Sequence, residues 1–301
     1  MRLSIVTVNY NNSDSTLKLL ESLINQTNQD FQIIVIDNAS EEADFNNLRQ
    51  NVDNTTLVRN NDNLGFSGGN NVGIKEALKN GAEWVVLLNN DTWAEDGFIS
   101  SLKAKLTGLG GIVGLPLDEG GQIAYCGRVE WLKPTLKHAY QLTSPDGKAI
   151  EDPRQSRDLP AYQLYAIGGA VAIRKEVFEK IGFWDEKYFL YFEDADFSLR
   201  AKKAGIPVTI VPDVVIHHNT SSTTKKLGSS LLLRYHYRNA LYFNLKNGPW
   251  YIKLAVWIWS FWIIKKQILK IMCRYKTEES HAILNGVFDF YHYRMGKIKT
   301  G

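Results

Sequence analysis

The chain has 301 residues and a net charge of +3, and 44% of its residues are hydrophobic. This length and composition exclude a disordered protein and favour one catalytic domain with a smaller appended region. The two cysteines, Cys126 and Cys273, lie far apart and outside any C-x-x-C pattern, which argues against a disulfide framework and a zinc site. Met1 and Arg2 lead directly into the β-branched run LSIVTV rather than into a signal peptide, so we expect a cytosolic protein.

The first half of the sequence alternates between short apolar runs and amphipathic segments. Runs rich in Val, Ile and Leu predict buried strands, whereas apolar residues three and four apart predict helices. The expected strands are Leu3–Val8, Phe31–Ile36, Thr56–Arg59 and Trp84–Leu88. The expected helices are one that Ser13 or Ser15 caps and that runs to Ile24, then Glu41–Gln50 and Asn71–Lys79. This order predicts an α/β fold with a parallel sheet covered on both faces, in which ligands bind beyond the carboxyl ends of the strands.

Polar residues gather directly after three of these strands, where a ligand is expected. The clusters are Asn9–Asn12, Asp37 with Asn38, and Asn89–Thr92. One carboxylate with waters and two phosphate oxygens is a common arrangement for Mg²⁺, because this ion dehydrates reluctantly and prefers octahedral oxygen coordination. We therefore predict Asp91 as a metal ligand. The alternative is an Asx-turn that leads into a helix at Ala94.

The segment Asn63–Asn71, NLGFSGGNN, places three glycines and several amides ahead of a helix. Glycines allow a ligand to approach the backbone closely, and the amino end of a helix favours anionic groups. The segment matches neither the dinucleotide-binding pattern nor the P-loop pattern. Taken alone it predicts only a glycine-rich turn.

From Gly110 to Pro160 the pattern loosens into short strands and a polar stretch, which predicts a variable loop region that faces a substrate. The prolines of this stretch are Pro134, Pro145, Pro153 and Pro160. Over residues 162–186 the sequence again predicts regular secondary structure: a strand, a tight turn at Gly168 and Gly169, a second strand and a helix.

The segment Phe189–Arg200, FLYFEDADFSLR, places the carboxylates of Glu193, Asp194 and Asp196 between aromatic residues and a helix. Neighbouring like charges and apolar surroundings raise the pKa of a carboxyl group, so one of these acids is a candidate general base near neutral pH. The alternative is that an aspartate caps the helix while Glu193 is solvated.

His217 and His218 follow the expected strands Val208–Val211 and Val214–Ile216. One imidazole is a candidate metal ligand beside Asp91. The alternative, which the pair alone favours, is two partly exposed histidines at the end of a strand.

Together these segments resemble glycosyltransferase family 2, the inverting enzymes of the GT-A fold. The resemblance covers about residues 3–223, and the motifs come in the order and approximate spacing of the family. They are SIVTVNYNN, VIDNAS, NLGFSGGNN, LLNNDT, GGAVAIRKEVFEKIGFWDE, FEDADFSLR and VPDVVIHHNTSST. The resemblance implies a mostly parallel nucleotide-binding sheet flanked by helices, with a helical C-terminal appendage.

The resemblance also implies roles for individual residues. Asp37 corresponds to the acid that binds the nucleobase and ribose, Asp91 to the metal-binding end of the DXD motif, and Asp194 to the catalytic base. His218 corresponds to a ligand of the metal or the diphosphate, since its offset from Pro212 matches the usual histidine of the family.

The motif departs from D-x-D because Asn89 stands first, which implies a modest affinity for the expected Mg²⁺ or Mn²⁺. The residues implied in donor binding are Asn9, Asp37, Asn63, Gly65, Phe66, Gly69, Asn70, Asn89, Asn90 and Asp91. Glu193 and Arg200 are expected to orient Asp194 and balance its charge. Trp184, Asp185 and Arg200 are expected near the acceptor sugar, with core packing as the alternative for the aromatic rings.

The motifs NLGFSGGNN, RYHYRNALYF and AILNGVFDFYHYRMGK look most like the branch that includes bacterial rhamnosyltransferases. This implies transfer of L-rhamnose from dTDP-L-rhamnose to an acceptor hydroxyl during assembly of a bacterial surface polysaccharide. The alternatives are the same reaction with a UDP-hexose or UDP-N-acetylhexosamine, a sugar-phosphate nucleotidyltransferase, and a non-catalytic sugar-binding relative. The SIVTVNYNN segment has no Lys or Arg, which disfavours nucleotidyl transfer.

We divide the chain into a catalytic domain, residues 1–223, and a basic helical region, residues 224–301, with the donor half of the domain ending near residue 110. Between Asp213 and Glu278 there is no acidic residue, and eleven Lys and Arg residues fall there. Such a region favours contact with an anionic surface, and we expect no nucleic-acid partner.

The segment Trp250–Arg274 holds an apolar run, Leu254–Ile264, that is shorter than the roughly 20 residues needed to span a bilayer. Lysines flank this run, which predicts a helix lying on an anionic membrane surface. We expect peripheral attachment to the inner face of the cell membrane, where a polyprenyl-linked or oligosaccharide acceptor is met. The alternative is packing on the catalytic domain or on a second subunit of a homodimer.

Overall fold

The computed structural model describes residues 1–141, 164–218 and 229–299. The part of the expected loop region that holds Pro145, Pro153 and Pro160 lies outside the described residues. The Ser/Thr-rich segment that follows His218 also lies outside them.

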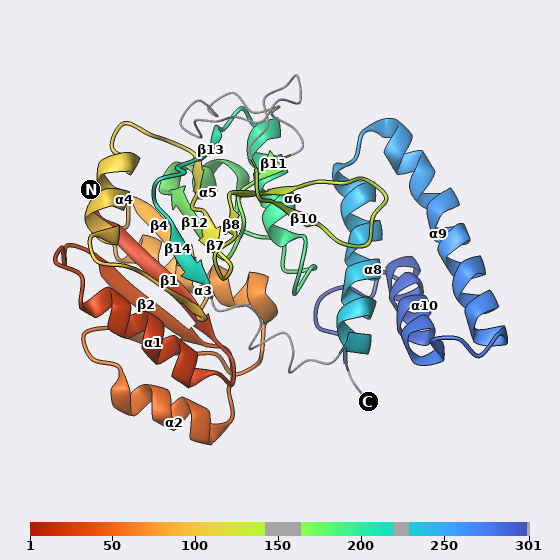
Figure 1. Ribbon diagram of the computed structural model, residues 1–301, viewed down its shortest axis with the longest axis horizontal. Coiled ribbons are helices and arrows are strands. Elements are labelled where there is room, and N and C mark those ends of the chain that lie inside the picture. The colour runs from red at the N-terminus through yellow and green to blue at the C-terminus, as the bar shows by residue number, and fades with distance from the viewer. Residues whose placement is uncertain (142–163, 219–228, 300–301) are drawn as a thin grey trace.

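A seven-stranded sheet forms the centre of the larger part of the molecule (Figure 1). Its strands are β1 (Leu3–Asn9), β2 (Gln32–Asp37), β3 (Thr56–Arg59), β4 (Trp84–Leu88), β6 (Ile112–Gly114), β12 (Ala170–Arg174) and β13 (Val208–Ile210). Their order is β13-β6-β12-β4-β1-β2-β3, and only β12 within this sheet runs antiparallel to its neighbours. The prediction of an α/β fold with a mostly parallel sheet is confirmed.

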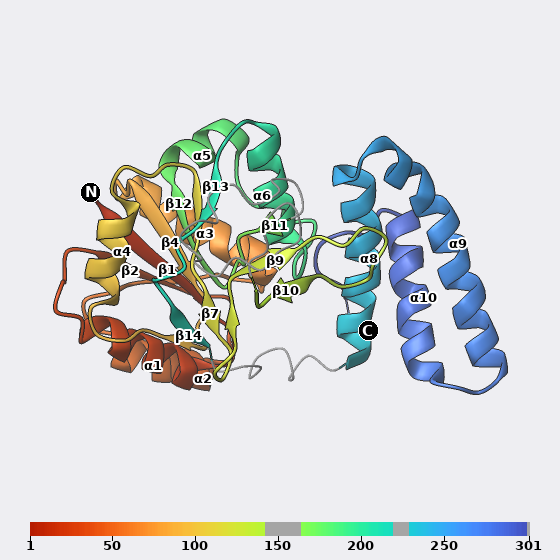
Figure 2. The same cartoon turned by 45° about the horizontal axis from the view of Figure 1, so that its top comes forward.

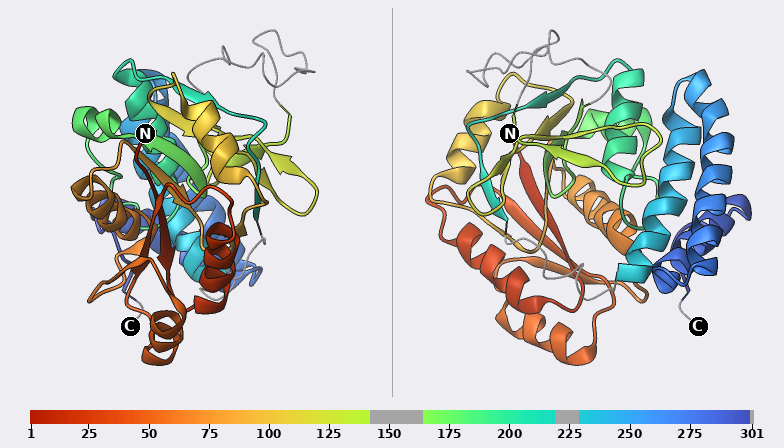
Figure 3. Two further views of the ribbon diagram at one scale, coloured as in Figure 1. Left: turned by 90° about the vertical axis from the view of Figure 1, so that its left-hand side faces the viewer. Right: turned by 45° about the vertical axis from the view of Figure 1, so that its right-hand side comes forward.

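Helices cover both faces of this sheet. They are α1 (Ser13–Ile24), α2 (Glu42–Asn51), α3 (Gly65–Lys79), α4 (Phe98–Leu106), α5 (Lys175–Ile181) and α6 (Glu193–Lys203). Alternate residues of each strand point to opposite faces, so Ile5 packs with α1 and α4 whereas Val6 packs with α3 and α5. Figure 3 shows α1 and α4 on one side of the sheet and α3 and α5 on the other. The two apolar faces of the strands therefore form two cores.

The glycine-rich segment is helical, which corrects the expectation of a turn. Helix α3 begins at Gly65 rather than at Asn71. A Cβ atom on Gly69 would lie 2.9 Å from Val8 Cγ1, and one on Gly73 would lie 2.2 Å from Val6 Cγ1. The glycines therefore allow α3 to pack closely on β1, which brings the amino end of the helix to the carboxyl end of that strand.

Two small sheets lie beside the main one. The first contains β5 (Thr92–Trp93), β14 (Ile216–His218), β7 (Leu117–Asp118) and β8 (Ile123–Ala124), and the second contains β10 (Lys137–Ala139), β9 (Cys126–Arg128) and β11 (Leu164–Tyr165). The histidines thus lie within β14 rather than after a strand, and pairing of β14 with β5 sets His218 opposite Thr92. The alternative of a helix at Ala94 is wrong, because the chain enters β5 and helix α4 begins only at Phe98.

Three helices form the described C-terminal region. They are α8 (Ser229–Asn247), α9 (Trp250–Met272) and α10 (Thr277–Tyr291). Helix α8 lies nearest to the sheet, and α9 lies on the far side of the molecule (Figures 1 and 2). The loop between β9 and β10 reaches α8, where Leu132 N donates to Asn244 Oδ1 at 2.8 Å and Trp131 stacks on Phe243. The helical appendage expected from the sequence is present.

Candidate active site

A cavity of about 430 Å³ opens at the carboxyl ends of β1 and β4. The amino ends of α3 and α6 contribute to its walls, together with β14 and the β9–β10 hairpin. Ten of the predicted site residues line it: Asn63, Gly65, Phe66, Asn70, Asn89, Asn90, Asp91, Glu193, Asp194 and His218. The fold therefore brings together motifs that are more than one hundred residues apart in the sequence.

Asp91 and His218 form one end of the cavity. Asp91 Oδ1 lies 3.2 Å from His218 Nε2, and both side chains are largely buried. Burial lowers the pKa of His218, but its contacts with Asp91 and Glu119 outweigh this effect and raise that pKa above its usual range. Within the described residues, Asn89 Oδ1 is buried with no hydrogen-bond partner. The cavity lining thus includes the Asp91–His218 pair and Asn89, whose amide oxygen is unpaired.

Glu119 joins this end of the cavity to the β9–β10 hairpin. Its Oε1 atom lies 3.2 Å from His138 Nδ1 and 3.7 Å from His218 Nδ1. Tyr140 donates its hydroxyl to Glu119 Oε2 at 2.9 Å. His138 lines the cavity and lowers the pKa of Asp194 as a lesser contribution. Sequence reasoning missed Glu119 and His138, because they lie in a segment with no motif and meet only when the hairpin folds.

Glu193 and Asp194 stand at the amino end of α6 and line the same cavity. Asp194 accepts hydrogen bonds from Gly168 N at 3.0 Å and Ala195 N at 2.8 Å, whereas Glu193 Oε2 is buried with no partner in the described part of the chain. Burial raises the pKa of Asp194, and burial together with the Asp194 charge raises the pKa of Glu193 well above its usual range. Two adjacent carboxyl groups thus meet different environments.

Gly168 allows Asp194 to sit where it does. A Cβ atom at this position would lie 2.8 Å from Trp184 Cη2 and 3.1 Å from Asp194 Cβ. The Gly168 backbone therefore approaches the carboxylate closely enough to donate its N–H group. The predicted tight turn at Gly168 and Gly169 is present. Gly168, its first residue, is part of the candidate site because it donates a hydrogen bond to Asp194.

The remaining residues predicted to bind the donor, Asn9, Asp37 and Gly69, do not line the cavity. Asn9 and Asp37 are fully buried, and Asn9 Nδ2 donates to Asp37 Oδ1 at 3.1 Å. Arg59 Nε lies 3.5 Å from Asp37 Oδ2. Gly69 packs against Val8. The predicted roles of these residues in donor binding stay predictions.

Asn38 also lines the cavity, although it is not among the residues predicted to bind the donor. Its Nδ2 atom donates to Asn63 Oδ1 and to Gly65 O, both at 3.0 Å. Its Oδ1 atom accepts from Leu64 N at 3.1 Å. The signal that could have identified it is its position directly after Asp37, at the end of a buried strand.

Trp184 and Asp185 lie outside the lining of the cavity. Trp184 is only 3% exposed and packs among Phe66 and Phe197, which agrees with the core-packing alternative. Asp185 Oδ2 lies 2.7 Å from Lys246 Nζ and accepts a hydrogen bond from Tyr242 at 2.9 Å. Neither residue lines the cavity, and their predicted places near an acceptor sugar stay predictions.

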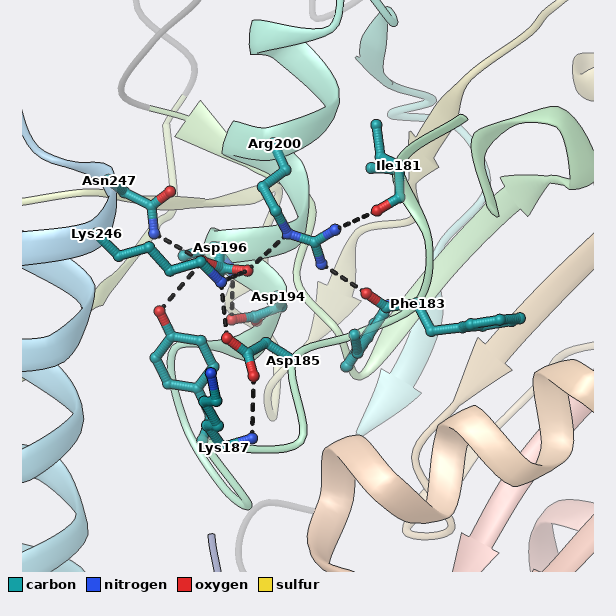
Figure 4. A network of polar contacts seen from close by, with 12 residues as sticks. Ile181, Phe183, Asp185, Lys187, Asp194, Asp196, Arg200, Lys246 and Asn247 are labelled. Carbon is teal, nitrogen blue, oxygen red and sulfur yellow. Dashed lines mark hydrogen bonds and ion pairs between the residues drawn. The ribbon is translucent and has the colours of Figure 1, made fainter. Parts of the chain in front are cut away.

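Arg200 pairs with Asp196 rather than with Asp194, which corrects the expectation that it balances the charge of the base. Its Nε atom lies 2.8 Å from Asp196 Oδ2, and its other nitrogens donate to Ile181 O and Phe183 O at 2.7 Å (Figure 4). Residues four apart on a helix face each other, so Arg200 meets Asp196, whereas Asp194 points to the cavity.

Comparisons with known proteins identify the family of this chain. The sequence model of glycosyl transferase family 2 matches residues 4–182, and that of glycosyl transferase family group 2 matches residues 154–275. The dTDP-rhamnosyl transferase RfbF of Shigella flexneri is 26% identical over 225 residues, which cover 74% of this chain and 70% of the relative. The N-acetylglucosaminyl-diphospho-decaprenol L-rhamnosyltransferase of Mycobacterium tuberculosis is 23% identical over 273 residues, with coverage of 83% and 86%.

Solved structures show the same fold. TarS of S. aureus in complex with UDP-GlcNAc superposes with a TM-score of 0.58 at 16% identity, covering 96% of this chain and 80% of TarS. The mannosyltransferase PcManGT from Pyrobaculum calidifontis, in complex with GDP-Man and Mn²⁺, gives 0.55 at 14% identity, with coverage of 96% and 87%. Because the first sequence model spans more than half of the residues, the chain belongs to glycosyl transferase family 2 and is a glycosyltransferase of the GT-A fold.

Proposed function

We propose that the protein is an inverting glycosyltransferase that moves a sugar from a nucleoside diphosphate donor to an acceptor hydroxyl. The observation that carries this proposal is that Asp194 and the Asp91–His218 pair line one cavity. Asp194 takes the proton of the acceptor hydroxyl while the hydroxyl oxygen bonds to the anomeric carbon. The bond from that carbon to the diphosphate oxygen breaks, and the nucleoside diphosphate leaves. A single displacement inverts the anomeric centre and needs no covalent intermediate.

The residues at the Asp91 end fit a divalent metal. Asp91 supplies a carboxylate, His218 an imidazole and Asn89 an unpaired amide oxygen, while no group of three His, Cys, Asp or Glu side chains in the described ranges is placed to hold an ion alone. Two or three protein ligands completed by water and diphosphate oxygens suit Mg²⁺ or Mn²⁺. When bound, such an ion supplies positive charge that stabilises the leaving diphosphate.

For the donor we propose dTDP-L-rhamnose. This choice is supported by the names of the two relatives described above, one a dTDP-rhamnosyl transferase and the other an L-rhamnosyltransferase. Asn38, Asn63 and Asn70 line the cavity near the amino end of α3, and we expect their amide groups to contact the donor. The fold also accommodates UDP-GlcNAc in TarS and GDP-Man in PcManGT, so the nucleotide is a matter for experiment.

For the acceptor we propose a polyprenyl-diphosphate-linked sugar met at the inner face of the cell membrane. The name of the mycobacterial relative gives such an acceptor for that protein. In this chain the outward face of α9 carries Leu254, Ile258, Phe261 and Trp262, which are 54% to 75% exposed. Lys265 and Lys266 continue the same exposed surface. Across the described ranges, no helix combines the length and hydropathy needed to cross a bilayer.

A donor screen tests the proposed function. The purified protein is incubated with dTDP-L-rhamnose, UDP-glucose, UDP-N-acetylglucosamine and GDP-mannose, with Mg²⁺ or Mn²⁺, and release of each nucleoside diphosphate is followed. We expect release from dTDP-L-rhamnose to be fastest and to increase with a polyprenyl-diphosphate-linked acceptor. If another nucleotide sugar releases its nucleoside diphosphate faster, the proposed donor is wrong. If none of the four releases it, the proposed transfer reaction is wrong.

A further inference from the structure

The backbone that leads into Glu193 and Asp194 is strained. Phe189, Tyr191 and Phe192 have φ values of 64°, 71° and 74°, although none of them is glycine. Bulky residues avoid this left-handed region, so three of them within four positions persist only where the surrounding structure holds them. The same turn places Phe189, Leu190 and Tyr191 in the wall of the cavity.

Asn239 on α8 holds this turn through its side-chain amide. Its Nδ2 atom donates to Leu190 O at 2.7 Å, to Tyr188 O at 2.9 Å and to Tyr191 O at 3.3 Å. One fully buried amide therefore meets three of the four carbonyl groups of residues 188–191, which the strained backbone turns towards α8.

Arg238 fixes the orientation of that amide. Its Nε atom donates to Asn239 Oδ1 at 2.9 Å, and its Nη2 atom donates to Tyr188 O at 3.1 Å. Its Nη1 atom is directed to the C-terminal segment, where it donates to Gly296 O at 2.8 Å and Arg294 O at 3.2 Å. The arginine is fully buried, and burial lowers its pKa to about 10, so its guanidinium is still charged at neutral pH.

A second set of contacts joins α8 to α6 itself. Lys246 Nζ lies 2.8 Å from Asp196 Oδ1, and Asn247 Nδ2 donates to the same oxygen at 2.7 Å. Figure 4 shows these side chains converging on Asp196, two residues beyond Asp194. Helix α8 thus contacts the chain on both sides of the Glu193–Asp194 pair.

We propose that Arg238 and Asn239 are positioning residues of the transfer reaction, which hold the 188–192 turn so that Asp194 faces the cavity. This inference rests on the proposed role of Asp194 as the base. It gives a reason for the YRN sequence within RYHYRNALYF, and it makes α8 a part of the machinery that orients the base. Neither side chain lines the cavity, so each acts through the turn.

The test compares Asn239→Ala and Arg238→Lys with Asn244→Ala. Asn244 is also a fully buried asparagine of α8, but it binds Leu132 of the hairpin and Ala240 O instead of the turn. Misplacing a catalytic group by about 1 Å costs on the order of 10²-fold in rate. We expect kcat with dTDP-L-rhamnose to fall by about this factor in the first two variants, with the KM for the donor nearly unchanged. The control variant should lose stability and keep its kcat.

Hydrogen exchange of the backbone amides over residues 189–195 separates this inference from the proposed function. We expect faster exchange there in Asn239→Ala and Arg238→Lys but not in Asn244→Ala, whether or not the donor is the right one. Faster exchange with unchanged kcat would overturn the positioning role. Exchange equal to that of the control would overturn the structural basis of the proposal, and a wild-type protein without transferase activity would overturn the proposed function alone.

Discussion

Glu193 and Asp194 are neighbours with opposite hydrogen-bonding environments. Two backbone N–H groups stabilise the ionised form of Asp194, whereas Glu193 Oε2 meets no donor in the described structure. Where two carboxyl groups interact, the better solvated or hydrogen-bonded one ionises and the other keeps its proton. This difference supports the proposal that Asp194 is the base and Glu193 its neutral partner.

This assignment predicts that Glu193→Gln stabilises the protein as the pH rises. In the unfolded chain the Glu193 carboxyl titrates near its ordinary pKa of 4.5, and in the folded protein its pKa is well above this value. Below pH 4.5 the group is protonated in both states, and above it only the unfolded state loses the proton, so the free energy of unfolding falls. Glutamine removes this loss and stays neutral.

Thermal unfolding of the wild type and Glu193→Gln between about pH 4 and pH 8 measures the effect. The melting temperature of the variant should exceed that of the wild type by a margin that grows with pH, and most transfer activity should remain. A margin that shrinks as the pH rises would mean that Glu193 is ionised in the folded protein.

Asp91→Ala is expected to weaken binding of dTDP in the presence of Mg²⁺ or Mn²⁺ by at least tenfold, because the metal loses its carboxylate ligand. Calorimetry with and without the metal measures this, and chelation should weaken the wild type in the same direction. Asp96→Ala is the control, since Asp96 is exposed and outside the cavity lining. Equal affinities of the wild type and Asp91→Ala would remove Asp91 from the metal site.

At the scale of elements, helix α3 shows where sequence patterns mislead. Glycine clusters favour turns in general, yet here Gly69 and Gly73 lie on the helix face that meets β1. The strands were predictable because buried parallel strands are continuous apolar runs. The helix start was not, because the need for small residues comes from the partner strand rather than from the helix itself.

Gly73→Ala tests this packing. The added Cβ would lie 2.2 Å from Val6 Cγ1, so α3 must move or Val6 must change rotamer, and overpacking of this kind costs about 1–3 kcal/mol. Gly110→Ala is the matched control, since its Cβ would meet no atom closer than 3.7 Å. Chemical denaturation of the two variants should give a clear loss of stability only for Gly73→Ala, and equal stability would contradict the close approach of α3 and β1.

At the scale of the whole molecule, pairings between distant segments could not be predicted from the sequence. Sequence motifs placed Asp91, Asp194 and His218 in one site through resemblance, and the cavity includes all three. By contrast, the contacts of Asn239 cross from α8 to a turn about 50 residues earlier. Such contacts leave no local pattern, because they depend on how finished elements pack.

The exposed face of α9 predicts binding to anionic membranes. On this helix Trp259 packs partly against neighbouring helices, whereas Ile258, Phe261 and Trp262 are 75%, 69% and 54% exposed. Buried apolar area and attraction between lysines and anionic lipid act together in such helices. Flotation with vesicles that contain phosphatidylglycerol should therefore recover the wild type and lose most of the Ile258→Ser, Phe261→Ser and Trp262→Ser triple variant.

Ile24→Ser is the control, because Ile24 is 45% exposed on α1, far from α9 in the sequence. Added salt should weaken the flotation of the wild type, since it screens the lysine charges. Binding that the triple variant retains would contradict the membrane surface. The α9 face would instead be a subunit interface if the wild type forms a dimer, does not float with the vesicles, and loses the dimer in the triple variant.

The central claim is that Asp194 is the base of a sugar transfer, and the rate of transfer by Asp194→Asn tests it most directly. With dTDP-L-rhamnose and a polyprenyl-diphosphate-linked acceptor, loss of a general base should reduce kcat by about 10²- to 10⁴-fold or more. Calorimetric affinity for dTDP should stay close to that of the wild type, because Asp194 faces the acceptor side of the proposed reaction. Turnover near the wild-type rate in this variant would contradict the account.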